Sequence, residues 1–368
     1  MVIGKILAVS LICLLQISCS SGGDETTQKI SEEIVGDEIE QQEVTIEPID
    51  SIWVAGPENK IISWRDQVII PSVAGMLAFQ LDENGFIHSH HLHLEQTFSF
   101  GQVQNDFVAG LGRIVKVYNY DGDVFTKIHE TSSVNNRQIP FSSLDNCFYW
   151  VTINETEPRS SVERLCQESD SFTQDVVLQQ NGLLWNILAL PDNRIITIGA
   201  DSENSLISLY QEKDNSYQLL SVQKENIVLG GEDLEFIDNH LFVRAYANNI
   251  PDGLSGSEDN IGGGVLRYNI TGNLIHERTK ISDLDADSAG FDHIAVSPKG
   301  IFVAHGKTLQ HLILSNGKIT KRIITLLENS ISSVYVHGDY LITVLRDSPS
   351  SSETGPVGVH IFKLSELM

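Results

Sequence analysis

The feature that most constrains the fold of this chain is a repeated pattern of two apolar strands joined by a short polar turn. The turns centre near Asn59, Asn105, Asn146, Asn193, Asn239, Lys299 and Gly338, at intervals of about 39 to 60 residues. Asn, Asp and Gly tolerate the backbone conformations that tight turns need. After residue 50 no long stretch shows the 3.6-residue period of an amphipathic helix. The pattern therefore predicts an all-β protein.

Each repeat also contains a second hairpin, as in residues 112–130 and 263–281. Four strands in about 45 residues make up one blade of a β-propeller. Seven turns then predict a single β-propeller of seven four-stranded blades. Six and eight blades are the alternatives, because the region from residue 193 to residue 299 contains long loops that obscure the count.

The last repeat supplies only three strands, over residues 332–336, 340–345 and 357–364. The segment Glu43–Ile49, just before the first repeat, has the apolar alternation of a strand. We expect this N-terminal segment to form the outer strand of the last blade and to close the ring. The propeller domain is therefore predicted to span residues 43–368.

Two turns carry a resemblance to known propellers. Residues 190–193 (Leu-Pro-Asp-Asn) and 296–300 (Val-Ser-Pro-Lys-Gly) are similar to turns of WD-repeat-like and lactonase-type bacterial propellers. The resemblance covers most of residues 44–368 and rests on the pattern of turns and strands. The Trp-Asp dipeptides of true WD repeats and the Asp-boxes of sialidases are missing. The resemblance thus implies the fold and no particular functional family.

The first 18 residues resemble the signal peptide of a bacterial lipoprotein. Lys5 precedes an apolar run over residues 6–15, and Ser18 stands directly before Cys19. The run is shorter than the about 20 residues that a membrane-spanning helix needs, so we expect a cleaved signal. The resemblance implies lipid attachment at Cys19 in the bacterial cell envelope, and Ser20 favours the outer membrane. The alternative is an ordinary signal peptide that contains a cysteine.

Residues 19–42 are predicted to form an acidic, flexible tether, because they contain few apolar groups. Ten acidic residues and one Lys lie between Asp24 and Asp50. A short amphipathic helix over residues 30–39 is the alternative. The whole chain has a formal net charge of −25, which no basic cluster offsets. Nucleic acid is therefore excluded as a partner.

Cys147 and Cys166 flank a predicted hairpin whose turn lies near residues 155–160. The midpoint between the two cysteines falls inside this turn, so they would lie nearly opposite each other on antiparallel strands. The Cα separation of such pairs fits disulfide geometry. We therefore expect a structural disulfide, and two free thiols are the alternative.

Asp283, Asp285, Asp287 and Asp292 form an acidic segment in which the first three carboxylates alternate. Such alternation is typical of the start of a calcium loop. However, Ser288 stands where that loop takes Gly, and Ile294 stands where it takes Glu. A solvated acidic loop is favoured over a calcium site, and calcium is the only cofactor that the sequence suggests.

A histidine cluster at His88, His90, His91 and His93 is interpreted as part of an exposed outer strand of the first blade. Motifs of hydrolytic nucleophiles, metalloprotease helices and nucleotide-binding loops were not found. We therefore predict a non-enzymatic binding or scaffold module for a partner protein or envelope polymer. The recognition elements would be the loops of residues 247–264 and 349–355. The alternative is a metal-dependent enzyme of lactonase or glycan-lyase type.

Overall fold

The computed structural model describes residues 40–44, 46–55, 61–72, 75–92, 99–111, 114–121, 124–132, 141–154, 158–169, 171–225, 228–246, 264–283, 293–315, 318–346 and 356–367. The chain divides into two compact units, residues 1–33 and 34–368, and the description below concerns the second. The predicted signal peptide and Cys19 lie outside the described residues. Within the described ranges no helix is long and apolar enough to cross a membrane.

The strands form seven sheets, which we number as blades in chain order. Blade 1 contains β3 (Ile62–Trp64), β4 (Gln67–Ser72), β5 (Gly75–Asp82) and β6 (Gly85–Leu92). Blade 2 contains β7 (Ser99–Val103), β8 (Asp106–Leu111), β9 (Ile114–Tyr120) and β10 (Phe125–Ser132). Blade 3 contains β11 (Phe141–Leu144), β12 (Cys147–Ile153), β13 (Ser160–Glu168) and β14 (Ser171–Gln180). Blade 4 contains β15 (Leu183–Leu190), β16 (Arg194–Ala200), β17 (Ser205–Lys213) and β18 (Ser216–Glu225).

The remaining blades have longer connections or strands from both ends of the chain. Blade 5 contains β19 (Val228–Ile237), β20 (His240–Tyr246), β21 (Gly264–Thr271) and β22 (Leu274–Asp283). Blade 6 contains β23 (His293–Ser297), β24 (Gly300–His305), β25 (Thr308–Ser315) and β26 (Lys318–Leu326), together with β1 (Glu40–Val44). Blade 7 contains β27 (Ser330–His337), β28 (Tyr340–Arg346), β29 (Pro356–Lys363) and β2 (Asp50–Ala55), and the 3₁₀ turn Leu364–Glu366 follows.

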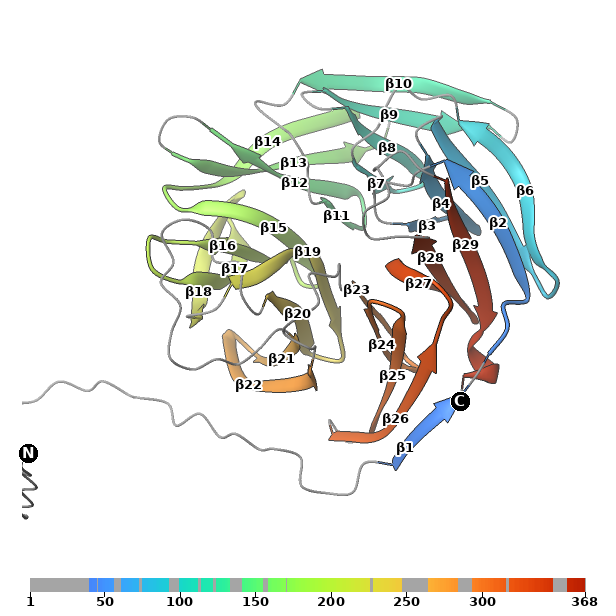
Figure 1. Cartoon of the computed structure of the whole chain (residues 1–368). Coiled ribbons are helices and arrows are strands. Elements are labelled where there is room, and N and C mark those ends of the chain that lie inside the picture. The colour runs from blue at the N-terminus through green and yellow to red at the C-terminus, as the bar shows by residue number, and fades with distance from the viewer. Residues whose placement is uncertain are drawn as a thin grey trace, which may run out of the picture. The chain divides into compact units, whose positions relative to one another are not determined.

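The seven sheets are arranged around a common centre (Figure 1). The first strand of each blade is the innermost, and the inner strands of successive blades contact each other from β3 through β7, β11, β15, β19 and β23 to β27. Seven apolar clusters are buried in this ring, and each contains residues of two neighbouring blades. In the cluster between blades 4 and 5, for example, Leu209 packs with Leu241 and Tyr268. Burial of both faces of every sheet is what stabilises the ring.

The structure confirms the all-β fold, the seven blades and six of the seven predicted turns. The exception is the first turn, predicted near Asn59, because the first blade instead turns at Arg65 and Asp66. Residues 56–60 lie outside the described residues. The apolar segment before them, Asp50–Ala55, belongs to the last blade.

The closing strand is N-terminal, as predicted, but it is β2 and not the segment Glu43–Ile49. β2 pairs antiparallel with β29 from Asp50 opposite Ile361 to Ala55 opposite Pro356. The Val54 side chain of β2 is buried against blade 1, in the apolar cluster that spans blades 7 and 1. The predicted segment is divided instead, because β1 ends at Val44 and pairs parallel with β26, and Pro48 lies in the connection that follows. Proline has no N–H to donate to a ladder, which disfavours one continuous strand.

Candidate functional site

The ring has two faces that differ in the length of their longest connections. In every blade the turn between the first and second strands contains two or three residues. These turns lie together, since the Gln104 N–H donates to the Asp145 carbonyl (3.2 Å) and Lys299 Nζ pairs with Asp339 Oδ1 (2.6 Å). We call this side the turn face. Because neighbouring strands are antiparallel, the connection between the second and third strands of each blade begins on the opposite side, the loop face.

Both loops that the sequence suggested for recognition begin and end on the loop face. The first connects Tyr246 at the end of β20 with Gly264 at the start of β21. The second connects Arg346 at the end of β28 with Pro356 at the start of β29. Residues 247–263 and 347–355 themselves lie outside the described residues. The strand ends therefore place two long connections, from blades 5 and 7, on one side of the ring.

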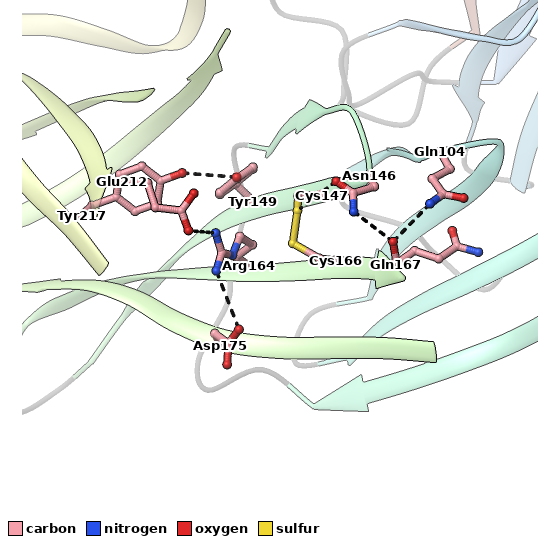
Figure 2. The surroundings of a disulfide bond; sticks show 10 residues. All are labelled: Gln104, Asn146, Cys147, Tyr149, Arg164, Cys166, Gln167, Asp175, Glu212 and Tyr217. Atoms are coloured by element: carbon pink, nitrogen blue, oxygen red, sulfur yellow. Dashed lines mark hydrogen bonds and ion pairs between the residues drawn. A yellow bond between two sulfur atoms is a disulfide. The ribbon is translucent and has the colours of Figure 1, made fainter. Parts of the chain in front are cut away.

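A buried ion pair links blades 3 and 4 (Figure 2). Arg164 on β13 contacts Glu212 on β17, with 2.6 Å between Nη1 and Oε1, and the two side chains are only 9% and 17% exposed. Asp175, the cross-strand partner of Arg164 on β14, lies 3.8 Å from the guanidinium. Burial lowers the pKa of Arg164, but the hydrogen bond and the charge of Glu212 outweigh this and raise the pKa above its ordinary value. Arg164 therefore stays charged.

Two tyrosines complete this contact between the blades. The hydroxyls of Tyr149 on β12 and Tyr217 on β18 lie 3.3 Å apart, and both side chains are buried. Burial, reinforced by the hydrogen bond with Tyr149, raises the pKa of Tyr217 well above its ordinary value. Tyr217 is thus held neutral, and Arg164 is paired with a residue of the neighbouring blade. The ion pair and the tyrosines together form a buried contact that joins blades 3 and 4.

The disulfide pair lies on the same sheet, close to this contact (Figure 2). Cys147 on β12 is directly opposite Cys166 on β13, as the sequence predicted for strands of one hairpin. The two sulfurs are within bonding distance at 1.95 Å, and the Cα atoms are 4.1 Å apart. The next position in the same register on that face of the sheet pairs Tyr149 with Arg164. The covalent link and the ion pair thus hold adjacent positions of blade 3.

Two buried serines join blades through the backbone. The Leu184 N–H donates to Ser160 Oγ (2.9 Å), and the Leu229 N–H donates to Ser205 Oγ (3.3 Å). In both pairs the serine begins the third strand of one blade, and the amide lies near the start of the next blade, 24 residues later. Sequence reasoning missed these contacts. The signal was present, because the two pairs are related by one repeat of the blade.

Replacing Ser160 with alanine is expected to lower the free energy of unfolding by about 1–3 kcal/mol, because the Leu184 N–H would be buried without an acceptor. Equilibrium denaturation in urea measures the change. Ser216→Ala is the matched control, since Ser216 Oγ bonds the Lys213 carbonyl in an exposed turn. If the two substitutions lower the free energy of unfolding equally, the buried hydrogen bond between the blades stabilises the protein no more than an exposed one.

The contact that closes the ring also depends on a serine. Ser63 on β3 donates its N–H to the Tyr335 hydroxyl (2.7 Å), and its Oγ lies 2.7 Å from His337 Nδ1. Tyr335 and His337 both belong to β27 of blade 7, so these bonds connect the last blade to the first. Burial lowers the pKa of His337 below its ordinary value of 6.5, and the charge of Asp66 opposes this only in part. Neutral His337 can accept a hydrogen bond from the Ser63 hydroxyl through Nδ1.

Acidification is expected to destabilise this closure. Because the folded pKa of His337 is lowered, the unfolded chain takes up the proton first, and stability falls as the pH drops through 6.5 toward the folded value. His129, His240 and His360 shift in the same direction. A series of melting temperatures between about pH 7 and pH 5 should be shallower for His337→Gln than for the unsubstituted chain. Parallel curves would contradict the assignment.

The predicted calcium ligands are not brought together by the described part of the structure. Asp283 is the last residue of β22, and Asp285, Asp287 and Asp292 lie outside the described residues. Among the residues that are described, no group of three or more His, Cys, Asp or Glu side chains could hold a metal ion. His88, His90 and His91 lie on β6, the outer strand of blade 1, as the sequence suggested. His93 lies outside the described ranges.

Known structures of very different sequence share this architecture. Kuenenia stuttgartiensis hydrazine synthase is 12% identical over 87% of this chain and 97% of its own chain, with a TM-score of 0.59. The Neurospora crassa Pan2 WD40 domain is 10% identical over 86% of this chain and 96% of its own, with a TM-score of 0.57. The extracellular domain of a hybrid two-component system from B. thetaiotaomicron is 12% identical over 86% of this chain, which spans 40% of that longer one, with a TM-score of 0.51.

This chain is a WD40-like β-propeller in fold. No family model matches its sequence, and the comparison with curated proteins finds no match either. At 10–12% identity the likeness of these structures shows the arrangement of strands and nothing about activity. The function must therefore be argued from the ring itself.

Proposed function

We propose that this chain is a lipid-anchored, extracytoplasmic propeller that acts as a binding or scaffold module for a partner protein or envelope polymer. The observation that supports recognition is the contrast between the two faces. The turn face carries short turns, and those of blades 2 and 3 and of blades 6 and 7 bond to each other. The loop face carries the ends of the connections 247–263 and 347–355, which can change in length and composition without disturbing any blade.

The buried polar groups support the same proposal, because those described above bind neighbouring blades. Arg164 is paired with Glu212, and Ser63 is bonded to Tyr335 and His337. Such groups hold a rigid ring, which is what a scaffold needs. Rigid elements present loops to a partner with little loss of conformational entropy on binding.

The anchoring is proposed from the sequence alone. The residues around Cys19 resemble a lipoprotein signal, and several acyl chains would hold the protein firmly, because each buried CH₂ contributes about 0.8 kcal/mol. Outer-membrane attachment is part of the proposal. Metabolic labelling with a palmitate analogue should mark the unsubstituted protein and not Cys19→Ser. Labelling of both, or membrane retention of Cys19→Ser, would argue against lipid on that residue.

A crosslinking pulldown from intact membranes tests the binding role. The unsubstituted protein should recover a partner that is lost when residues 249–261 and 350–354 are replaced by short Gly-Ser segments. The matched control changes the exposed turn at Asp214 and Asn215 on the turn face, and it should keep the partner. If the folded, unsubstituted protein recovers no partner above background, the proposed scaffold role is contradicted. Loss of the partner in both variants would contradict recognition through the loop face.

A further inference from the structure

Blade 6 differs from the other blades because a fifth strand covers its outer edge. β1 pairs parallel with β26 from Glu40 beside Lys321 to Val44 beside Thr325. In the described parts of the other six sheets, the outermost strand is the fourth. Figure 1 shows β1 alongside β26, before the chain continues into β2 of blade 7. One end of the acidic N-terminal segment is therefore docked on a sheet edge.

Blade 6 also differs from the others in charge. Residues 293–327 contain no Asp or Glu, and they contain five cationic residues: Lys299, Lys307, Lys318, Lys321 and Arg322. Each of the other six blades contains acidic residues, and the whole chain has a net charge of −25. Three of the five cations belong to β26, the strand that β1 covers. The acidic segment is thus paired with the one blade whose charge is opposite to its own.

The side chains described on the docked strand are largely exposed, whereas the chain that follows it is held by buried contacts. Gln42 and Glu43 are exposed, and Val44 is only half-buried. By contrast, Ile46 packs into the apolar cluster between blades 6 and 7, and the Ile49 N–H donates to the Ile361 carbonyl (2.9 Å). Parallel pairs are slightly less stable per residue than antiparallel ones. Residues 40–44 can therefore open locally while the ring stays closed.

We propose that the outer edge of β26 is a docking site for an extended acidic strand of a partner protein, and that Glu40–Val44 is its resident occupant. An open sheet edge binds an added strand through main-chain hydrogen bonds, and here the cations of β26 select for acidic sequences. This inference rests on the proposed binding function and names the chemistry of the partner. A partner must displace the chain's own strand, so the resident strand inhibits binding until it opens.

A peptide-binding experiment tests this site on the full chain carrying Cys19→Ser. The probe is a fluorescein-labelled peptide with the sequence of residues 37–47, and fluorescence anisotropy measures its binding. Replacing residues 40–44 by Gly and Ser should tighten binding about tenfold, because the competitor is removed. Adding Lys321→Glu and Arg322→Glu should weaken binding about tenfold, since both cations flank the docked strand.

Three results would overturn the proposal. The first is a peptide with Gln41→Pro and Gln42→Pro that binds as well as the original, because one of two successive N–H groups of a strand must face β26, and the same charge without that donor cannot extend the sheet. The second is no binding to the emptied variant although its melting temperature is unchanged. The third is binding of the Cys19→Ser chain to phosphatidylglycerol vesicles that Lys321→Glu abolishes, because the cations would then bind a lipid surface.

Hydrogen exchange tests the unsubstituted chain directly, in case the variants fold poorly. The amides of residues 41–44 should exchange at least about tenfold faster than those of β25 in the same blade. Equally slow exchange would mean that the resident strand does not leave, which contradicts the proposal. The two proposals can also fail separately. If the loop-face variant loses the partner but the variant with Lys321→Glu and Arg322→Glu still binds it, the binding function stands and only the β26 site is wrong.

Discussion

Replacing Arg164 with methionine is expected to lower the free energy of unfolding by about 3–5 kcal/mol, because Glu212 would be left buried without its counter-charge. The 2.6 Å contact joins blades 3 and 4, so its loss weakens an interface and not only a strand. Urea denaturation, followed by circular dichroism, measures the change. Burial makes this the most sensitive ion pair that we describe, since both side chains are more than four-fifths covered.

Lys127→Met is the matched control for this experiment. Lys127 also contacts a glutamate, Glu130, but the two side chains are 50% and 41% exposed. Exposed pairs contribute little, because water and salt screen them. The double substitution Arg164→Met with Glu212→Leu should recover much of the lost stability, since no unpaired buried charge remains and Asp175 is exposed to water. If the double variant is less stable than Arg164→Met alone, the buried charge is not the cause of the loss.

Removing the disulfide is expected to cost about 3 kcal/mol of stability, because an open loop gives the unfolded chain more conformational freedom. Cys147 and Cys166 are 19 residues apart in sequence. The double variant Cys147→Ser, Cys166→Ser should unfold at lower urea than the oxidised chain. Addition of a thiol reductant should bring the unsubstituted chain to the same midpoint and leave the double variant unchanged. A reductant effect of equal size on both proteins would show that the loss arises elsewhere.

Local sequence patterns predicted most of the ring, because the turns of a propeller are local structures. Asp192 and Asn193 both have positive φ angles (65° and 55°), which Asn and Asp tolerate better than other side chains. A turn of this kind is visible in sequence wherever it occurs. The same holds for the hairpin of Cys147 and Cys166, since the two residues are placed by one turn between them.

The closing strand could not be assigned in the same way. The segment Glu43–Ile49 alternates apolar and polar residues, whereas Asp50–Ala55 ends in four consecutive apolar residues, and each segment precedes the first blade. The choice depends on which one fits against β29, more than 300 residues later, and no local signal reports that fit. The contact between Arg164 and Glu212 was missed for a related reason. It joins third strands of two different blades, and charged residues are too common in this chain for their spacing to reveal a pair.

The composite seventh blade has a consequence for how the protein reaches its folded state. β2 is made early, and its partner β29 follows more than 300 residues later. At about 5–20 residues per second, synthesis of the intervening chain takes about 15–60 s. During that interval β2, which contains Ile52 and Trp53, has no strand to pair with. Trp53 remains 64% exposed even after folding. The chain is an open arc until its last strand is added, and a chain that ended just before β29 would have six complete blades and no pairing between β28 and β2.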